Sequence, residues 1–303
     1  MSESLSPEER IFSVYSKKQT TNEALPVSRK GTLVKQIRYD LTIGLLQVWP
    51  KYLPAAAIFL IPVFQLAVMV RTENSVGTFT LGDTILYTFS GMTVYEPAAG
   101  DPFTIPVIWL LMNLYLAYVV GSYPARDLHG YGQQILLRSR RRGQWWAGKC
   151  LWNLISVAVY YALGWLIMMV SSLILGGNMT LRITPELWKM LTWEGPEAER
   201  TLMLSAILLP PLCSAAVSLL QMAVMMIARP VIGYLLVACL FTASAYFYSP
   251  LLIGNASMML RSDLMMEGGV PLSLSTGICL AVALASLVGG YFYFRRSDIM
   301  DKA

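Results

Sequence analysis

The chain has 303 residues, a net charge of +5, 55% hydrophobic residues and 14% charged residues. Because soluble domains carry roughly 25% charged residues, this composition excludes an ordinary soluble globule and is typical of a membrane protein. The single histidine, His129, excludes a cluster of histidine ligands. The four cysteines lie in apolar stretches without the spacing of a zinc site or a disulfide framework. We therefore expect no metal site on this chain.

The first part of the chain is polar and is expected to lie outside the membrane. The polar and charged composition of residues 1–31 predicts a mobile cytoplasmic tail. In the next stretch, 32–52, apolar residues recur every three or four positions, which predicts an amphipathic helix. Basic and aromatic residues flank it, so we expect an interfacial helix on the cytoplasmic membrane surface. The alternative is a direct extension of the first span, but Pro50 and Pro54 favour a bend.

Six later stretches are apolar enough to cross a membrane, since a spanning helix needs roughly 20 mostly apolar residues. They cover residues 53–70, 103–124, 150–175, 201–228, 230–254 and 271–294. None contains Lys, Arg, Asp or Glu, in keeping with the cost of placing a charge in hydrocarbon. The sequence therefore predicts an all-α, polytopic membrane protein with a six-helix transmembrane domain over 53–294.

Two local features modify this layout. Pro210 and Pro211 predict a kink or break in the fourth span, because proline removes a backbone donor and its ring clashes with the preceding turn. The segment 255–270, rich in methionine, is interpreted as a partly re-entrant segment on the outside. For its methionines, contact with lipid or a partner is favoured over metal binding.

Basic residues are distributed unevenly between the spans. If the N-terminus is cytoplasmic, 18 of the 23 Lys and Arg residues lie inside. Cytoplasmic segments carry such an excess, so we predict that both termini, including the tail 295–303, face the cytoplasm. Topology then explains the positive charge, and no nucleic-acid partner is expected.

The loop 126–149, between the second and third spans, has a distinctive residue order. An acidic residue with glycines precedes an apolar run; a basic turn and a Gly-Lys pair follow. This order resembles the ABC-2 type permease family. The matching positions are Asp127, Gly130 or Gly132, residues 135–137, Ser139 with Arg140, Gly148-Lys149, and the basic tail 294–299.

The resemblance implies the transmembrane subunit of a bacterial ABC exporter in the plasma membrane. Its loop would couple to a separate ATP-binding subunit, which would hold ATP and Mg. The implied coupling residues are Asp127, Leu128, Gly130, Gly132, Ile135, Leu136, Leu137 and Arg138. The apolar residues 135–137 would supply the buried contact, because an exposed apolar run needs a partner surface, with Asp127 and Arg138 at its rim. A second permease copy or a paralogue would complete the transmembrane unit.

Several alternatives stay open. The basic residues of the loop 126–149 are also explained without a partner, because cytoplasmic loops carry an excess of Lys and Arg that sets membrane orientation. An ion-gradient-driven secondary transporter or channel is the alternative function, although such proteins usually place ionisable residues in the membrane. The substrate is expected to be hydrophobic or amphipathic, and analogy with permeases of peptide, toxin or lantibiotic export and immunity leaves lipid-like molecules and drugs possible.

Residues 143–149 match the first seven positions of the nucleotide-binding pattern G-x-x-x-x-G-K-[ST]. Cys150 replaces the hydroxyl that contacts magnesium, two tryptophans fill the loop, and no strand is expected before it. We therefore expect neither a nucleotide site nor a catalytic site on this chain.

Polar residues within the predicted spans are candidates for a transport pathway. They are Gln65, Asn113, Tyr115, Tyr118, Ser122 and Gln221. Hydrogen bonding between helices and contact with the membrane interface explain each of them equally well.

Overall fold

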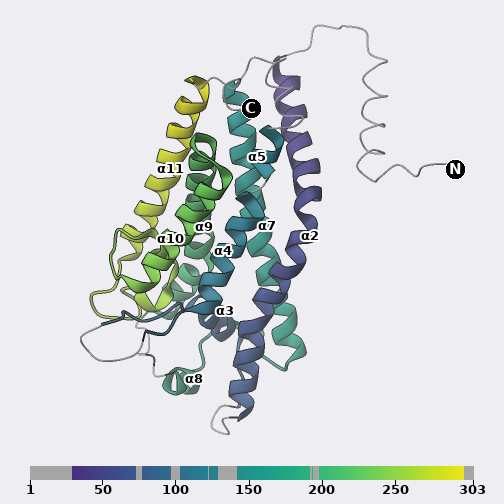
Figure 1. The fold of residues 1–303 in the computed structure, drawn as a ribbon. Helices are drawn as coiled ribbons and strands as arrows, with labels where there is room; N and C mark the ends of the chain where they lie inside the picture. Colours follow the sequence, from purple (N-terminus) through teal and green to yellow (C-terminus); the bar gives the residue numbers. More distant parts are fainter. Residues whose placement is uncertain are drawn as a thin grey trace, which may run out of the picture.

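The computed structural model describes residues 29–72, 77–96, 103–121, 123–128, 142–191, 193 and 198–296. Within these ranges the chain is mostly helical, and β structure is limited to the isolated bridges Thr80–Asn178 and Ser262–Val270. The long helices lie side by side in one elongated bundle (Figure 1). The all-α class is therefore confirmed for the described part of the chain.

Four helices among the described residues are long and apolar enough to cross a membrane: Trp49–Thr72 within α2 (Arg29–Thr72), α7 (Arg142–Ile174), α9 (Glu199–Ile227) and α11 (Leu272–Arg296). Two shorter apolar helices, α4 (Val107–Gly121) and α10 (Pro230–Tyr246), pack among them. At 1.5 Å per residue, these two are about 22 and 25 Å long, against about 30 Å for the hydrocarbon core. By length and composition, four helices thus indicate a membrane protein.

The structure corrects the prediction for the N-terminal region. Helix α2 runs without interruption from Arg29 to Thr72 and includes Pro50, Pro54 and Pro62. Residues 32–52 are therefore not a separate interfacial helix but an extension of the first apolar helix, and this helix begins inside the predicted tail. The reason is tertiary packing: α2 lies along α7, and burial against a neighbouring helix offsets the hydrogen bonds that proline removes. Residues 1–28 lie outside the described part.

Other boundaries differ as well. Helix α9 continues through Pro210 and Pro211, so the predicted break is absent from this helix as the structure describes it. Helix α7 begins eight residues before the predicted span, and α10 ends at Tyr246 rather than at 254. The 3₁₀ turns η2 (Ile253–Ser257) and η3 (Met259–Arg261) follow α10. Both turns contact α9, and η2 also packs on α10 and α11.

The segment after α10 is therefore built into the end of the bundle. Met258 and Met259 are almost fully buried in the chain's own core, which replaces the predicted contact with lipid or a partner.

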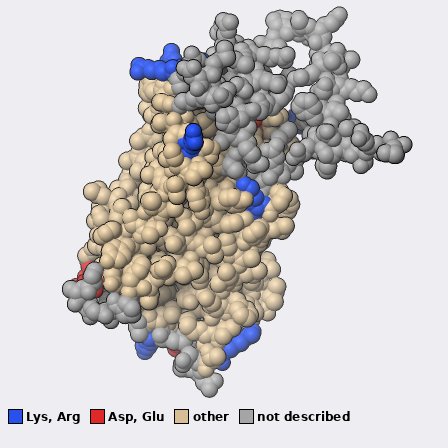
Figure 2. Space-filling view, viewed as in Figure 1, with Lys and Arg blue, Asp and Glu red and all other residues tan. Residues whose placement is uncertain are grey.

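The six apolar helices alternate in direction, so the start of α2 and the end of α11 lie at one end of the bundle (Figure 1). The short helix α5 (Tyr123–Leu128) lies at this end, which we call the α5 end. Helix α3 (Leu81–Phe89) and helix α8 (Pro185–Met190) lie at the opposite α3 end with η2 and η3. On the face shown in Figure 2, charged side chains gather toward the two ends and leave a broad uncharged middle.

Candidate functional site

A buried cluster of three charged side chains lies at the α5 end. Lys149 of α7 is fully buried, and its Nζ lies 2.5 Å from Oδ1 of Asp40 on α2 and 2.8 Å from Oδ2 of Asp127 on α5. The side chains of the two aspartates are only 2% and 7% exposed. This ion cluster, Asp40, Asp127 and Lys149, joins α2 to two helices, α5 and α7, that lie far from it in the sequence.

Aromatic side chains enclose the ion cluster. The Tyr123 hydroxyl donates to Asp40 Oδ1 at 3.1 Å, and the Trp145 indole N–H donates to Asp127 Oδ2 at 3.3 Å. Lys149 Nζ also lies 4.5 Å from the centre of the Tyr123 ring and 5.3 Å from that of Trp145. An ammonium group is attracted to ring faces, so these rings stabilise the charge while they exclude water from it.

Helix geometry explains why these side chains meet. Trp145, Lys149 and Trp152 follow one another at intervals of four and three residues, so they share one face of α7. On α2, Gly44 lies four residues after Asp40 and faces the same neighbour. A Cβ at Gly44 would overlap the indole of Trp152. The missing side chain thus lets α2 approach α7 closely enough for the Asp40–Lys149 contact.

The ion cluster contains two carboxylates and one ammonium group. Burial raises the pKa of Asp40; Lys149 opposes this shift, and the charge of Asp127 adds to it. Among the described residues, Asp40 Oδ2 is buried without a hydrogen-bond partner. The cluster therefore retains acceptor capacity and is not a balanced ion pair.

The structure places only part of the predicted coupling segment. Leu128 ends α5, and its side chain is outside the described part. Gly130, Gly132, Ile135, Leu136, Leu137 and Arg138 also lie outside the described residues. Asp127 is described, and its carboxylate points into the ion cluster. Lys149 and Trp145 thus engage Asp127 within the chain, and its place at the rim of a partner contact stays a prediction.

The stretch that resembles a nucleotide-binding loop is helical. Residues 143–149 lie within the first turns of α7, where Trp145 and Trp146 are buried and Lys149 contacts two carboxylates. A phosphate-binding loop instead presents its backbone N–H groups and its lysine to the ligand. This geometry is not that of such a loop.

The structure brings two of the predicted pathway residues together. Asn113 of α4 and Gln221 of α9 are buried and line a cavity of about 10 Å³ between α4, α9 and α10. Gln221 Nε2 donates to the carbonyl of Ala117 at 3.0 Å, and Asn113 Nδ2 donates to the carbonyl of Trp109 at 2.8 Å. The first of these bonds joins α9 to α4, and the second stays within α4.

The other pathway candidates lie apart from this pair. Gln65 is exposed on α2, and Tyr118 is 51% exposed, with Lys51 Nζ 4.3 Å from the centre of its ring. Tyr115 is half-buried and donates to the carbonyl of Lys51 at 2.7 Å. Ser122 lies outside the described residues.

Asp40 and the role of Lys149 cannot be inferred from the sequence patterns. The pattern of 32–52 makes Asp40 one polar position of an amphipathic helix, and the motifs of the loop make Lys149 a part of a Gly-Lys pair. One available signal is that Asp127 and Lys149 bracket a loop rich in basic residues. Nothing local indicates that Asp40, 109 positions before Lys149, joins them.

The fold and the ion cluster define a helical protein with apolar helices of membrane-spanning length and a buried charged site at one end. The chain belongs to the family described as "Protein of unknown function (DUF2705)", whose model matches residues 58–300. This range includes Asp127 and Lys149 but not Asp40. No curated protein and no solved structure matches the chain.

Proposed function

We propose that the chain is the transmembrane permease subunit of an ATP-driven exporter of the ABC type, with six spans and both termini in the cytoplasm of a bacterial cell. The resemblance of loop 126–149 and of the basic tail to the ABC-2 family supports this proposal. So do the alternating directions of the six apolar helices. In this topology the α5 end faces the cytoplasm, where an ATP-binding subunit would dock.

The observation that carries the proposal is the way the ion cluster anchors the two flanks of residues 129–141. Asp127 lies two residues before this segment and Lys149 eight residues after it, and their charged groups are 2.8 Å apart. Asp40 connects both to α2. A partner that pushes on the loop would therefore move α2, α5 and α7 together, as the coupling of ATP binding to the membrane helices requires.

In this proposal, Ile135, Leu136 and Leu137 form the buried contact with the ATP-binding subunit. Burying one aliphatic side chain contributes about 1.5–3 kcal/mol, whereas an exposed ion pair contributes about 0–1 kcal/mol. The apolar run should thus dominate the affinity, and the basic residues of the loop should mainly set its orientation. ATP and Mg would be bound by the partner.

The proposed substrate is hydrophobic or amphipathic, such as a peptide, toxin, lipid-like molecule or drug. The cavity beside Asn113 and Gln221 has room for about one water molecule. Export would then require α4 and α9 to separate, or a route along an interface with a second permease copy or a paralogue.

The ion cluster also favours a second candidate function. Buried ionisable residues mark proton and ion pathways in transporters driven by ion gradients, and Asp40 has a raised pKa and, among the described residues, an oxygen without a hydrogen-bond partner. The cluster lies at the end of the bundle: Asp40 is outside the Trp49–Thr72 segment of α2, and Lys149 is in the first turns of α7. We therefore rank a secondary transporter or channel below the ATP-driven exporter.

The decisive experiment purifies the chain from the membranes of its own cell and asks whether an ABC ATP-binding subunit copurifies with it. Leu136→Asp/Leu137→Asp should abolish copurification and the stimulation of ATP hydrolysis. The matched control, Arg140→Ala/Arg141→Ala, should retain both. Full assembly and full stimulation of ATP hydrolysis in the leucine variant would show that the basic loop only sets the orientation of the chain in the membrane and does not contact an ATP-binding subunit. Transport that depends on an ion gradient and not on ATP would favour the second candidate.

A further inference from the structure

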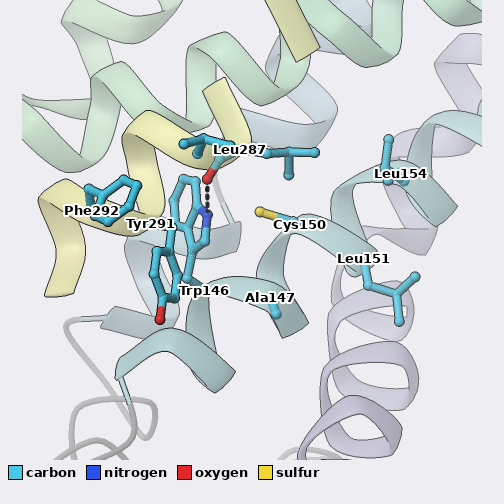
Figure 3. Close-up of a pocket in the computed structure, with 9 residues that line it drawn as sticks. Trp146, Ala147, Cys150, Leu151, Leu154, Leu287, Tyr291 and Phe292 are labelled. Atoms are coloured by element: carbon cyan, nitrogen blue, oxygen red, sulfur yellow. Dashed lines mark hydrogen bonds between the residues drawn. The ribbon is translucent and has the colours of Figure 1, made fainter. Parts of the chain in front are cut away.

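An apolar groove opens on the outer face of the bundle at the α5 end, between α7 and α11 (Figure 3). Its volume is about 510 Å³, within the range of roughly 300–1,000 Å³ that is typical of ligand sites. Its wall includes Trp146, Cys150 and Leu154 on α7 and Leu287, Tyr291 and Phe292 on α11. Among the described residues, no charged side chain lines it.

Two glycines let the walls of this groove come together. A Cβ at Gly143 on α7 would lie 2.6 Å from the Tyr291 ring of α11, and a Cβ at Gly290 on α11 would overlap the Trp146 ring of α7. Each helix thus accepts an aromatic ring of the other. The Trp146 indole N–H donates to the carbonyl of Leu287 at 3.0 Å, as the dashed line in Figure 3 shows. The polar atom of the indole is therefore satisfied, and its apolar body contributes to the groove.

Positive charge continues the groove beyond its aromatic end. Arg295 and Arg296 form the last turn of α11 and are exposed. They lie four residues after Tyr291 and Phe292 respectively, and side chains four residues apart lie on the same helix face. The same surface is thus apolar along the bundle and basic at its end.

We propose that this groove binds one anionic phospholipid, with an acyl chain between α7 and α11 and its headgroup at Arg295 and Arg296. An acyl chain matches a long wall without charge, and a phosphate matches two arginines. Trp and Tyr prefer the level of the headgroups, where Trp146 and Tyr291 would then lie. Juxtamembrane basic residues attract anionic lipids. The inference requires a membrane around the bundle and does not rest on coupling to an ATPase.

Native mass spectrometry can test this site. The whole chain, purified in mild detergent, is mixed with equal amounts of dioleoyl phosphatidylglycerol and dioleoyl phosphatidylcholine, which differ only in the headgroup. The wild type should retain phosphatidylglycerol with a preference of about tenfold, set mainly by two juxtamembrane arginines. Arg295→Gln/Arg296→Gln should reduce this preference to near equality. The matched control Arg182→Gln/Arg200→Gln changes two exposed arginines at the α3 end and should preserve it.

A second pair of variants tests the groove itself. Ala147 lines the groove and is exposed, so Ala147→Trp should fill it and prevent retention of either lipid. Ala57→Trp makes the same change at an exposed position of α2 and should have no effect. The proposal is overturned if the arginine variant keeps the preference or if Ala147→Trp keeps the lipid. Loss of a dimer in Ala147→Trp with unchanged lipid retention would instead identify the groove as a contact between two copies.

Discussion

Among the described residues, the two ends of the bundle each bury one basic side chain, but they satisfy it in different ways. Lys149 at the α5 end contacts two carboxylates. Arg261 at the α3 end is also fully buried, yet among the described residues it contacts only neutral acceptors. These are the side chain of Asn255 and the backbone carbonyls of Met92, Thr93, Ser244, Ala245 and Phe247. Burial lowers the pKa of Arg261 to about 10, so it stays charged at neutral pH.

Because their partners differ, Arg261 acts as a fixed cap on a helix end, whereas the contacts of Lys149 can change with the charge of its partners. Three acceptors of Arg261 are carbonyls at the end of α10, where the helix leaves carbonyl groups without partners and its dipole favours a cation. Such a contact holds the α3 end together regardless of whether nearby carboxyl groups are protonated. The ion cluster, in contrast, depends on the balance of one ammonium group and two carboxylates. We therefore expect the α5 end to be the end that responds to a partner.

The largest expected effect is that of Lys149→Met. It leaves two buried carboxylates without a counter-ion and should destabilise the protein by about 3–5 kcal/mol. The measurement is unfolding by SDS in mixed micelles, followed by circular dichroism. Lys189→Met, at an exposed position of α8, is the control and should change stability by less than about 0.5 kcal/mol.

A triple variant distinguishes charge imbalance from loss of packing in this prediction. Lys149→Met/Asp40→Asn/Asp127→Asn removes all three charges and should recover more than half of the lost stability, because replacing a whole buried ion cluster is less costly than breaking it. If the triple variant is as unstable as Lys149→Met alone, the contribution of Lys149 is its packing.

Arg261→Lys is expected to have the second largest effect, although it keeps the charge. An ammonium group has three donors, fewer than the six acceptors around Arg261, and it lacks the planar fork that reaches them. Leaving buried carbonyls unpaired should cost about 2–3 kcal/mol. Hydrogen exchange should increase at residues 244–247, where α10 ends.

The control for this prediction is Arg200→Lys, at an exposed position of α9, which should leave both stability and exchange unchanged. Unchanged exchange at the end of α10 in Arg261→Lys would mean that charge alone, without the geometry of the guanidinium group, holds the α3 end.

The helices are predictable from the sequence because apolar runs dominate it, whereas their ends are not. The run after Pro230 continues in the sequence to 254, but α10 stops at Tyr246. Arg261 and Asn255 stop it there by binding carbonyls at its end and just beyond it. Residues that lie beyond the helix thus set its end.

The continuity of the helices through their prolines and the presence of the ion cluster could not be predicted from the sequence for a related reason. Pro50 and Pro210 each favour a helix end locally, yet both lie inside continuous helices that pack along neighbours. Asp40 carries no signal of its own, because its burial depends on the face that α2 turns to α7. Gly44 allows that approach, but a glycine within a helical pattern does not by itself indicate a close contact between helices.

The smallest expected effect is that of Tyr123→Phe, and it tests whether charge or the enclosing neutral groups hold the α5 end. The substitution removes only the hydroxyl, which donates to Asp40 Oδ1 at 3.1 Å and accepts from Lys149 Nζ at 3.4 Å. The ring should keep its contact with Trp152, at 4.4 Å between centroids, and its position beside Lys149. One net hydrogen bond contributes about 1 kcal/mol, so the loss should be about a third or less of that for Lys149→Met.

The matched control is Tyr248→Phe at the α3 end, whose hydroxyl donates to the carbonyl of Gly268 at an exposed site, and it should cost less than about 0.5 kcal/mol. A loss in Tyr123→Phe as large as in Lys149→Met would mean that the hydroxyl positions the whole cluster, and the contrast between a charge-held end and a carbonyl-held end would have to be abandoned.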